Sequence, residues 1–247
     1  MPASKQPSLR PSHRWQRVHA ALIVGHALTV KAKRDELMRC HFRQSDVDGA
    51  CSVHCLCSVL VILNFAKAEA LTWMTKRKYG VPANLWNAFA DVYFEGCQPQ
   101  ELVERIELLN LPLRVTARLM DDADLDTKAM QWLGSGQLVM LSFKSLLHRR
   151  TNHWALGIGC EGIQIGGKAV ADTLLLLDPS GPEPAFRSWN ARLRLQQYPR
   201  RPTEGSTVKL TTEQRRKVIR WVYDAPEWSP ELVVLTSAIR IQRKDVS

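Results

Sequence analysis

Hydrophobic positions follow a helical pattern in the first half of the chain. The segment 51–70, CSVHCLCSVLVILNFAKAEA, is apolar almost all round, which predicts a buried helix rather than a surface one. Shorter helices are expected at 84–94, at 99–109 and over 121–136. The last of these begins with acidic residues and ends with glycine, as helices commonly do.

Strand-like patterns dominate the second half. Alternation or short apolar runs predict strands at 113–119, 137–143, 153–159, 173–178, 207–211 and 231–242. A helix is expected at 213–223, EQRRKVIRWVY, and a short helix or strand within 17–38. Because helices precede strands instead of alternating with them, the pattern predicts an α+β domain.

The composition is that of a globular protein of 247 residues with 45% hydrophobic content. We expect a disordered basic tail over 1–16 and a single domain over 17–247, with a C-terminal extension from about 186. No apolar run reaches the length of a membrane-spanning helix, and the N-terminus lacks a convincing secretory signal. These features predict a soluble cytoplasmic protein, whose oligomeric state the sequence leaves unknown.

The net charge of +10 is concentrated at the two ends of the chain. Residues 1–43 hold nine Lys and Arg against two acids, and residues 200–247 hold ten against six. The remaining residues hold fifteen against sixteen. Nucleic-acid modules usually concentrate basic charge on a folded face, so we expect no nucleic-acid partner, although a basic nucleic-acid-binding protein stays as an alternative.

Six cysteines are present, and three of them fall within seven residues of one expected helix. Such neighbours cannot all pair in a disulfide framework, which favours free thiols. Cys51, His54 and Cys55 share one helical face, so zinc binding together with Cys40, His41 or Cys57 stays open. We expect no metal, because the later cysteines, Cys97 and Cys160, are isolated, and we also expect no organic cofactor.

A catalytic thiol explains why Cys51 follows the small polar turn Asp48-Gly49-Ala50. A helix start stabilises a thiolate through its backbone N–H groups and its dipole. Gln44 offers a side-chain amide that, with the backbone N–H of Cys51, could hold a developing oxyanion.

A base and its orienting partner are expected on two neighbouring strands. His153 opens one expected strand, and Asp178 closes the next. If these strands pair antiparallel, both side chains come to the same end of the sheet. Asp178 could then orient the imidazole of His153, as the third member of a catalytic triad does.

This order of motifs resembles papain-like cysteine peptidases, and more narrowly their C39-like branch. The resemblance covers roughly residues 40–185. It rests on Gln44 before DGAC, on the NHWALGIG segment that contains His153, and on the LLLLDP segment that contains Asp178. It implies a papain-like α+β fold in which Cys51 starts a buried helix packed on an antiparallel sheet.

The resemblance also implies a function. The expected enzyme is a cysteine peptidase that hydrolyses a peptide or isopeptide bond of a protein or peptide substrate through a thioester. A deamidase, an acyltransferase and an inactive protein-binding module with the same fold stay open as alternatives. By analogy, a bacterial effector delivered into a target cell is one setting for such an enzyme.

Overall fold

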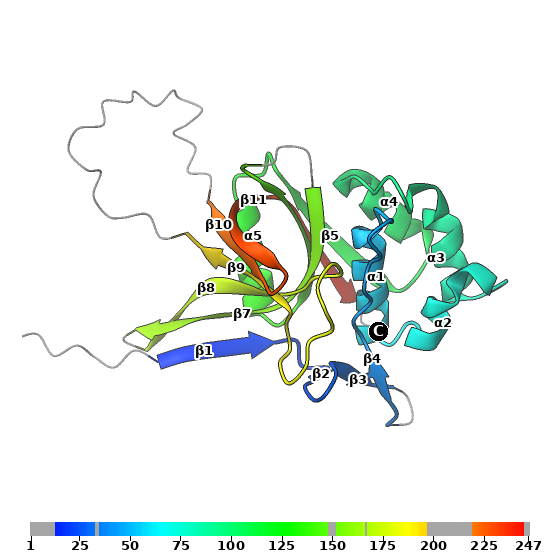
Figure 1. The fold of residues 1–247 in the computed structure, drawn as a ribbon, viewed down its shortest axis with the longest axis horizontal. Coiled ribbons are helices and arrows are strands. Elements are labelled where there is room, and N and C mark those ends of the chain that lie inside the picture. The colour runs from blue at the N-terminus through cyan, green and yellow to red at the C-terminus, as the bar shows by residue number, and fades with distance from the viewer. Residues whose placement is uncertain (1–12, 33–34, 148–151, 166, 197–218, 245–247) are drawn as a thin grey trace, which may run out of the picture.

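A closed antiparallel β-barrel is the main feature of the fold (Figure 1). The computed structural model describes residues 13–32, 35–147, 152–165, 167–196 and 219–244. Six strands follow one another around the barrel in the order β7-β6-β11-β10-β9-β8, and β8 pairs with β7 to close it. Two further strands extend this sheet, because β1 pairs with β7 and β5 pairs with β11.

The strands of the large sheet differ greatly in length. They are β1 (His13–Val18), β5 (Leu113–Leu119), β6 (Leu138–Ser145), β7 (Asn152–Ile165), β8 (Lys168–Leu177), β9 (Ala191–Leu195), β10 (Trp221–Ala225) and β11 (Trp228–Arg243). A separate small antiparallel sheet contains β2 (Leu22–Ile23), β3 (Thr29–Lys31) and β4 (Leu37–Arg39).

Most helices gather on one side of the barrel (Figure 1). This group contains α1 (Cys51–Ile62), α2 (Ala68–Thr72), α3 (Val81–Phe89) and α4 (Pro99–Leu108), with the 3₁₀ turns η1 (Met74–Lys76) and η2 (Ala90–Val92). Helix α1 packs directly on β7 and β6, and α5 (Leu125–Gly134) packs on the barrel away from this group. Among the described residues, no helix combines the length and hydrophobicity needed to cross a bilayer.

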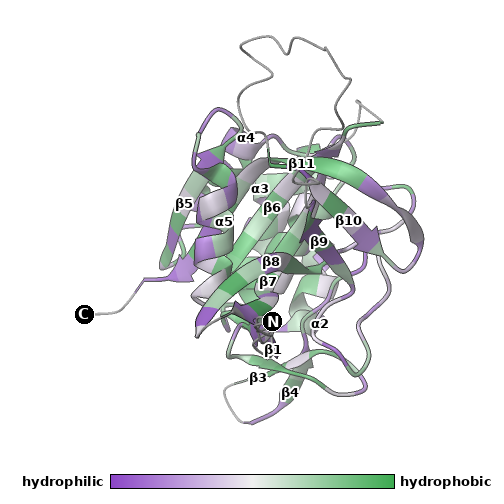
Figure 2. Ribbon diagram, turned by 90° about the vertical axis from the view of Figure 1, so that its left-hand side faces the viewer, coloured by the Kyte–Doolittle hydropathy of each residue, from purple (hydrophilic) through white to green (hydrophobic). Residues whose placement is uncertain are grey.

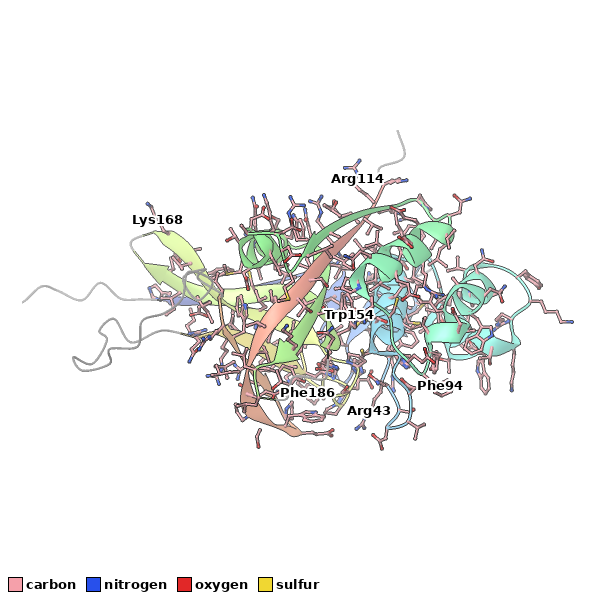
Figure 3. All side chains as sticks on the ribbon, turned by 90° about the horizontal axis from the view of Figure 1, so that it is seen from above. Arg43, Phe94, Arg114, Trp154, Lys168 and Phe186 are labelled. Carbon is pink, nitrogen blue, oxygen red and sulfur yellow. The ribbon has the colours of Figure 1, made fainter. Side chains whose placement is uncertain are left out.

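The barrel wall is buried on both faces where it meets α1. On β6, Leu138 and Met140 belong to the core beneath the helices, whereas Val139 and Leu141 belong to the core inside the barrel. Apolar residues therefore follow one another from Leu138 to Leu141, and β6, β7 and β8 are coloured as predominantly hydrophobic in Figure 2. Trp154 lies in the core beneath the helices, while Arg43 and Phe94 lie at the surface (Figure 3).

The expected papain-like α+β fold is wrong. The structure is mostly β, with a closed six-stranded barrel and 24% helix. Much of the difference comes from the C-terminal part. Residues 221–223, expected to be helical, belong to β10, and β9 was not expected at all. Both strands complete the barrel, so the residues from about 186 onward are not a simple extension.

Several individual elements agree with their predicted positions. Helices α3, α4 and α5 and strands β5, β6, β7, β8 and β11 occupy the expected segments within a few residues at most ends. Residues 17–38 contribute to strands rather than to a helix. Strand β1 begins at His13, inside the expected tail, whereas residues 1–12, 207–211 and 213–218 lie outside the described residues.

Candidate active site

Cys51 is the first residue of α1 and lines a cleft of about 930 Å³. Only 8% of the residue is exposed. The sequence of the preceding turn explains how the thiol reaches this place. A Cβ on Gly49 would lie 2.3 Å from the carbonyl oxygen of Phe94, so only glycine lets the turn approach the segment after η2 this closely. The backbone N–H of Gly49 also donates to the carbonyl of Tyr93, at 3.2 Å.

Asp48 holds the turn in shape through its carboxylate. One oxygen accepts hydrogen bonds from the backbone N–H and the hydroxyl of Ser45, at 2.9 and 2.8 Å, and the other accepts from the N–H of Ala50, at 3.0 Å. Nε2 of His54 lies 3.6 Å from the same carboxylate. Although burial would raise the pKa of Asp48, these hydrogen bonds lower it. Asp48 therefore acts as a structural anchor beside Cys51.

His153 and Asp178 meet because β7 and β8 are antiparallel neighbours, as the sequence predicted. Leu156 of β7 lies opposite Leu177 of β8, which brings the start of one strand to the end of the other. Nε2 of His153 lies 2.8 and 2.9 Å from the two carboxylate oxygens of Asp178. The carboxylate is fully buried, whereas a quarter of the His153 side chain is exposed to the cleft.

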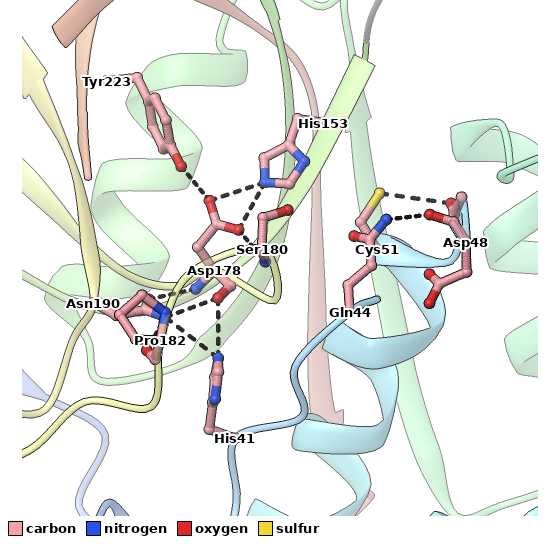
Figure 4. A network of polar contacts seen from close by, with 11 residues as sticks. His41, Gln44, Asp48, Cys51, His153, Asp178, Ser180, Pro182, Asn190 and Tyr223 are labelled. Carbon is pink, nitrogen blue, oxygen red and sulfur yellow. Dashed lines mark hydrogen bonds and ion pairs between the residues drawn. The ribbon is translucent and has the colours of Figure 1, made fainter. Parts of the chain in front are cut away.

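The imidazole of His153 lies between this carboxylate and Cys51 (Figure 4). Its Nε2 is engaged by Asp178, which leaves the other ring nitrogen for the thiol. Burial alone would lower the pKa of His153. The charge and hydrogen bond of Asp178, together with the nearby Cys51, outweigh that effect and raise the pKa to about 10.

Residues that the sequence did not single out hold Asp178. The hydroxyl of Tyr223 and the backbone N–H of Ser180 donate to its carboxylate. The buried side chain of Asn190 binds both backbone groups of Asp178: its Oδ1 accepts from the N–H at 2.6 Å, and its Nδ2 donates to the carbonyl at 2.8 Å. Nε2 of His41 lies 3.0 Å from the same carbonyl.

This arrangement keeps Asp178 charged in a buried place. Burial would raise its pKa, but the charge of His153 and the hydrogen bonds from His153, Tyr223 and Ser180 lower it instead. In contrast, burial lowers the pKa of His41, in spite of its contact with the Asp178 carbonyl.

Gln44 lies beside Cys51 on the same cleft, as its expected role requires (Figure 4). One hydrogen of its amide is donated to the carbonyl oxygen of Asp48, at 2.5 Å. The amide group has a second hydrogen, which can be donated to another acceptor. The backbone N–H of Gln44 donates to the carbonyl of Pro179, which ties this segment to the turn after Asp178.

Other residues of the cleft come from the helical side and from the barrel. They are Gly49, Glu95, Gly96, Cys97, Gln98, Phe143, Ser145, Leu147, Asn152, Trp154, Ser180, Tyr223, Glu227, Trp228, Ser229, Pro230 and Glu231. Cys97 is the second thiol on this cleft. Trp154 is buried, and its indole N–H donates to the carbonyl of Cys97, at 3.3 Å.

The helical face considered for zinc has other contacts. His54 faces Asp48 and the hydroxyl of Tyr93. Burial raises the pKa of Cys57 to about 12 and that of Cys55 well above its ordinary value. Within the described ranges, no three His, Cys, Asp or Glu side chains are grouped so that they could hold a metal ion.

The cleft thus brings together a thiol at a helix start, an imidazole with a raised pKa, a buried carboxylate and a side-chain amide. Groups of these kinds, in this order of contact, can attack a carbonyl carbon, transfer a proton to a leaving group and stabilise an oxyanion. No protein-family model matches the chain, and no curated protein is similar enough to it to indicate a relationship.

Proposed function

We propose that the protein is a cysteine hydrolase that cleaves a peptide or isopeptide bond through Cys51, His153 and Asp178. The hydrogen bonds of His153 to Asp178, with Cys51 on the same cleft beside this imidazole, carry this proposal. The order of the sequence motifs resembles that of C39-like peptidases, which supports the choice of an amide-type bond. The fold expected from that resemblance is not retained. We propose a protein or peptide as the substrate, which would reach Cys51 through this cleft.

The reaction would proceed in two halves. The Cys51 thiolate attacks the carbonyl carbon, and the resulting oxyanion accepts hydrogen bonds from the Cys51 N–H and the free hydrogen of the Gln44 amide. The imidazolium of His153 then protonates the departing amine, which leaves a thioester on Cys51. In the second half, neutral His153 removes a proton from water, and the hydroxide releases the acid and regenerates the thiolate.

All six cysteines are free thiols, and this chemistry requires Cys51 to stay reduced. We therefore propose that the enzyme works in a reducing compartment, the cytoplasm.

Alkylation followed by peptide mapping tests the proposal, and the cleft supplies its own control. Cys97 lines the same cleft, but its pKa is raised to about 12, mainly by burial and to a smaller extent by the charge of Glu101. At limiting iodoacetamide near pH 6, Cys51 should be alkylated well before Cys97, and His153→Ala should abolish that preference. Equal labelling of the two thiols in the unaltered protein would contradict an activated Cys51.

Removal of the Cys51 thiol should also remove the catalytic activity. Once a peptide library yields a cleaved substrate, Cys51→Ala should abolish turnover, whereas Cys97→Ala should retain most of it. Release of ammonia without chain cleavage would instead identify a deamidase that uses the same residues.

A further inference from the structure

Tyr223 reaches the buried end of the triad from the far side of the barrel. It lies on β10, which is separated from β8 by β9, and only 5% of the residue is exposed. Its hydroxyl donates to Oδ2 of Asp178 (Figure 4). The hydroxyl is thus the only side-chain donor other than His153 that binds the carboxylate among the described residues.

The tyrosine ring is itself held in place. Phe143 packs against it with ring centroids 5.2 Å apart, and the imidazole of His153 lies at 6.4 Å. Burial and the neighbouring carboxylates of Asp178 and Glu231 raise the pKa of Tyr223, so the hydroxyl stays protonated as a donor. A rigid, neutral donor therefore points at one oxygen of Asp178.

The two oxygens of this carboxylate have different fixed partners. Oδ1 accepts from the backbone N–H of Ser180 at 2.8 Å, while Oδ2 accepts from Tyr223. Together these two donors prevent the carboxylate from rotating about its Cβ–Cγ bond. Asn190 fixes the backbone of Asp178, but it makes no contact with the carboxylate. Without the hydroxyl, the backbone N–H of Ser180 at Oδ1 would be the one donor left among the described residues, apart from His153 itself, that resists rotation.

We propose that Tyr223 is a positioning residue of the active site, which fixes the carboxylate of Asp178 so that it holds His153 in line with Cys51. This inference rests on the proposed function. The titratable side chains that meet this carboxylate are His153 from β7 and Tyr223 from β10, and His41 meets the Asp178 backbone. Tyr223 touches no reacting atom in this scheme and acts through Asp178.

The pH dependence of alkylation isolates this role. At pH 10 an ordinary thiol is largely ionised without help, whereas at pH 6 a thiolate needs a neighbouring imidazolium. The ratio of the Cys51 alkylation rates at pH 6 and pH 10 therefore measures how well His153 is held. In Tyr223→Phe this ratio should fall by roughly 10-fold or more, the order expected for one hydrogen bond to a charged group.

Ser237→Ala is the matched control, because it removes a buried hydroxyl elsewhere in the barrel. The hydroxyl of Ser237 donates to that of Ser142 at 3.0 Å and contacts no residue of the triad. Ser237→Ala should leave the alkylation ratio within about twofold of the unaltered protein, whatever it does to the melting temperature. A similar fall in this control would overturn the proposal, because it would show that any lost hydroxyl disturbs the site.

The remaining outcomes are also distinct. If Cys51 in the unaltered protein reacts no faster than Cys97 at pH 6, the proposed function fails. If Cys51 is activated but Tyr223→Phe keeps the same ratio, only the positioning role is overturned. Should Tyr223→Phe fold poorly, p-aminophenylalanine in place of Tyr223 fills the same space as a weaker donor. The ratio should then fall by a smaller factor, and an unchanged ratio overturns the proposal.

Discussion

Two thiols on one cleft show that contacts, not exposure, distinguish a candidate nucleophile. Cys51 and Cys97 are each 8% exposed and line the same space. Cys97 lies near Glu101, and burial together with that carboxylate raises its pKa to about 12. Cys51 instead lies at the start of a helix, on the same cleft as the imidazole of His153. Because an imidazolium favours a neighbouring thiolate, we expect chemistry at Cys51 alone.

Replacement of Gln44 by alanine should slow turnover without blocking the thiol. A donor to the oxyanion acts in the transition state, so its loss should lower kcat by about 10²–10³ and leave KM nearly unchanged. Alkylation of Cys51 by iodoacetamide develops no oxyanion and should keep its rate. Steady-state kinetics and alkylation rates on the same preparation check both. If kcat stays at the unaltered value, Gln44 only supports the turn through its bond to Asp48.

Asp178→Asn should impair turnover less than His153→Ala or Cys51→Ala does. The asparagine oxygen can take the place of Oδ1, which accepts from Ser180, and its amide nitrogen can donate to the rotatable hydroxyl of Tyr223. Charge stabilisation of the imidazolium is lost, while the nucleophile and the base remain. We expect kcat to stay about 10²-fold above that of Cys51→Ala. If Asp178→Asn lowered kcat as much as Cys51→Ala does, that result would contradict an orienting role for Asp178.

Sequence reasoning predicted that the proposed triad residues would come together, but it did not predict the residues that hold them. Cys51, His153 and Asp178 each stand at the end of an apolar element, so their placement follows from local patterns and one strand pairing. Asn190 and Tyr223 contact Asp178 only after the barrel has closed. No local pattern in the sequence indicates such contacts.

The turn that connects Gln44 to α1 depends on close backbone packing. Gly49→Ala would place a Cβ 2.3 Å from the Phe94 carbonyl, so the turn and the start of α1 would have to shift. We expect a loss of about 1–3 kcal/mol of stability, as for other overpacked sites, together with slower alkylation of Cys51. Chemical denaturation and alkylation kinetics measure the two effects.

Gly25→Ala is the matched control for that change. A Cβ at Gly25 would lie 3.7 Å from the nearest carbonyl oxygen, which is ordinary contact. This variant should therefore unfold and react like the unaltered protein. If Gly49→Ala behaved in the same way as the control, the close approach of the turn to Phe94 would not be needed for the site.

At the scale of elements, buried strands were predicted well and the architecture was not. Runs such as TLLLLD predict a strand covered on both faces, and the second half of β8 is such a strand. The short strand β10 begins at the end of a basic, amphipathic stretch that favours a helix by local pattern alone. Its pairing with β11 is a local hairpin, whereas its pairing with β9 joins segments that are distant in sequence. Barrel closure therefore escaped prediction.

Titration of buried groups should make the stability of the whole molecule depend on pH in both directions. Burial lowers the pKa values of His19, His41 and His54, so these residues destabilise the folded chain as the pH falls below their ordinary value of 6.5. His153 acts in the opposite direction. Its folded pKa of about 10 exceeds 6.5, so the stability that it contributes is complete below pH 6.5 and is lost as the pH rises toward 10.

The contribution of His153 can be measured as a slope of stability against pH between 7 and 9. In this window the folded state holds a proton on His153 that the unfolded state has released, so the free energy of unfolding should fall with pH. The fall should not exceed about 1.4 kcal/mol per pH unit, and without Cys51 only the charge and hydrogen bond of Asp178 remain to raise the pKa of His153. The measurement belongs in Cys51→Ala, because a proton given up by the thiol would cancel the one kept by His153. Urea denaturation under reducing conditions at pH 7, 8 and 9 provides the slope.

Adding Asp178→Asn removes the charge that keeps His153 protonated, so the double variant should show a nearly flat line. Parallel slopes in the two proteins would mean that some other group, and not the His153–Asp178 pair, links folding to pH.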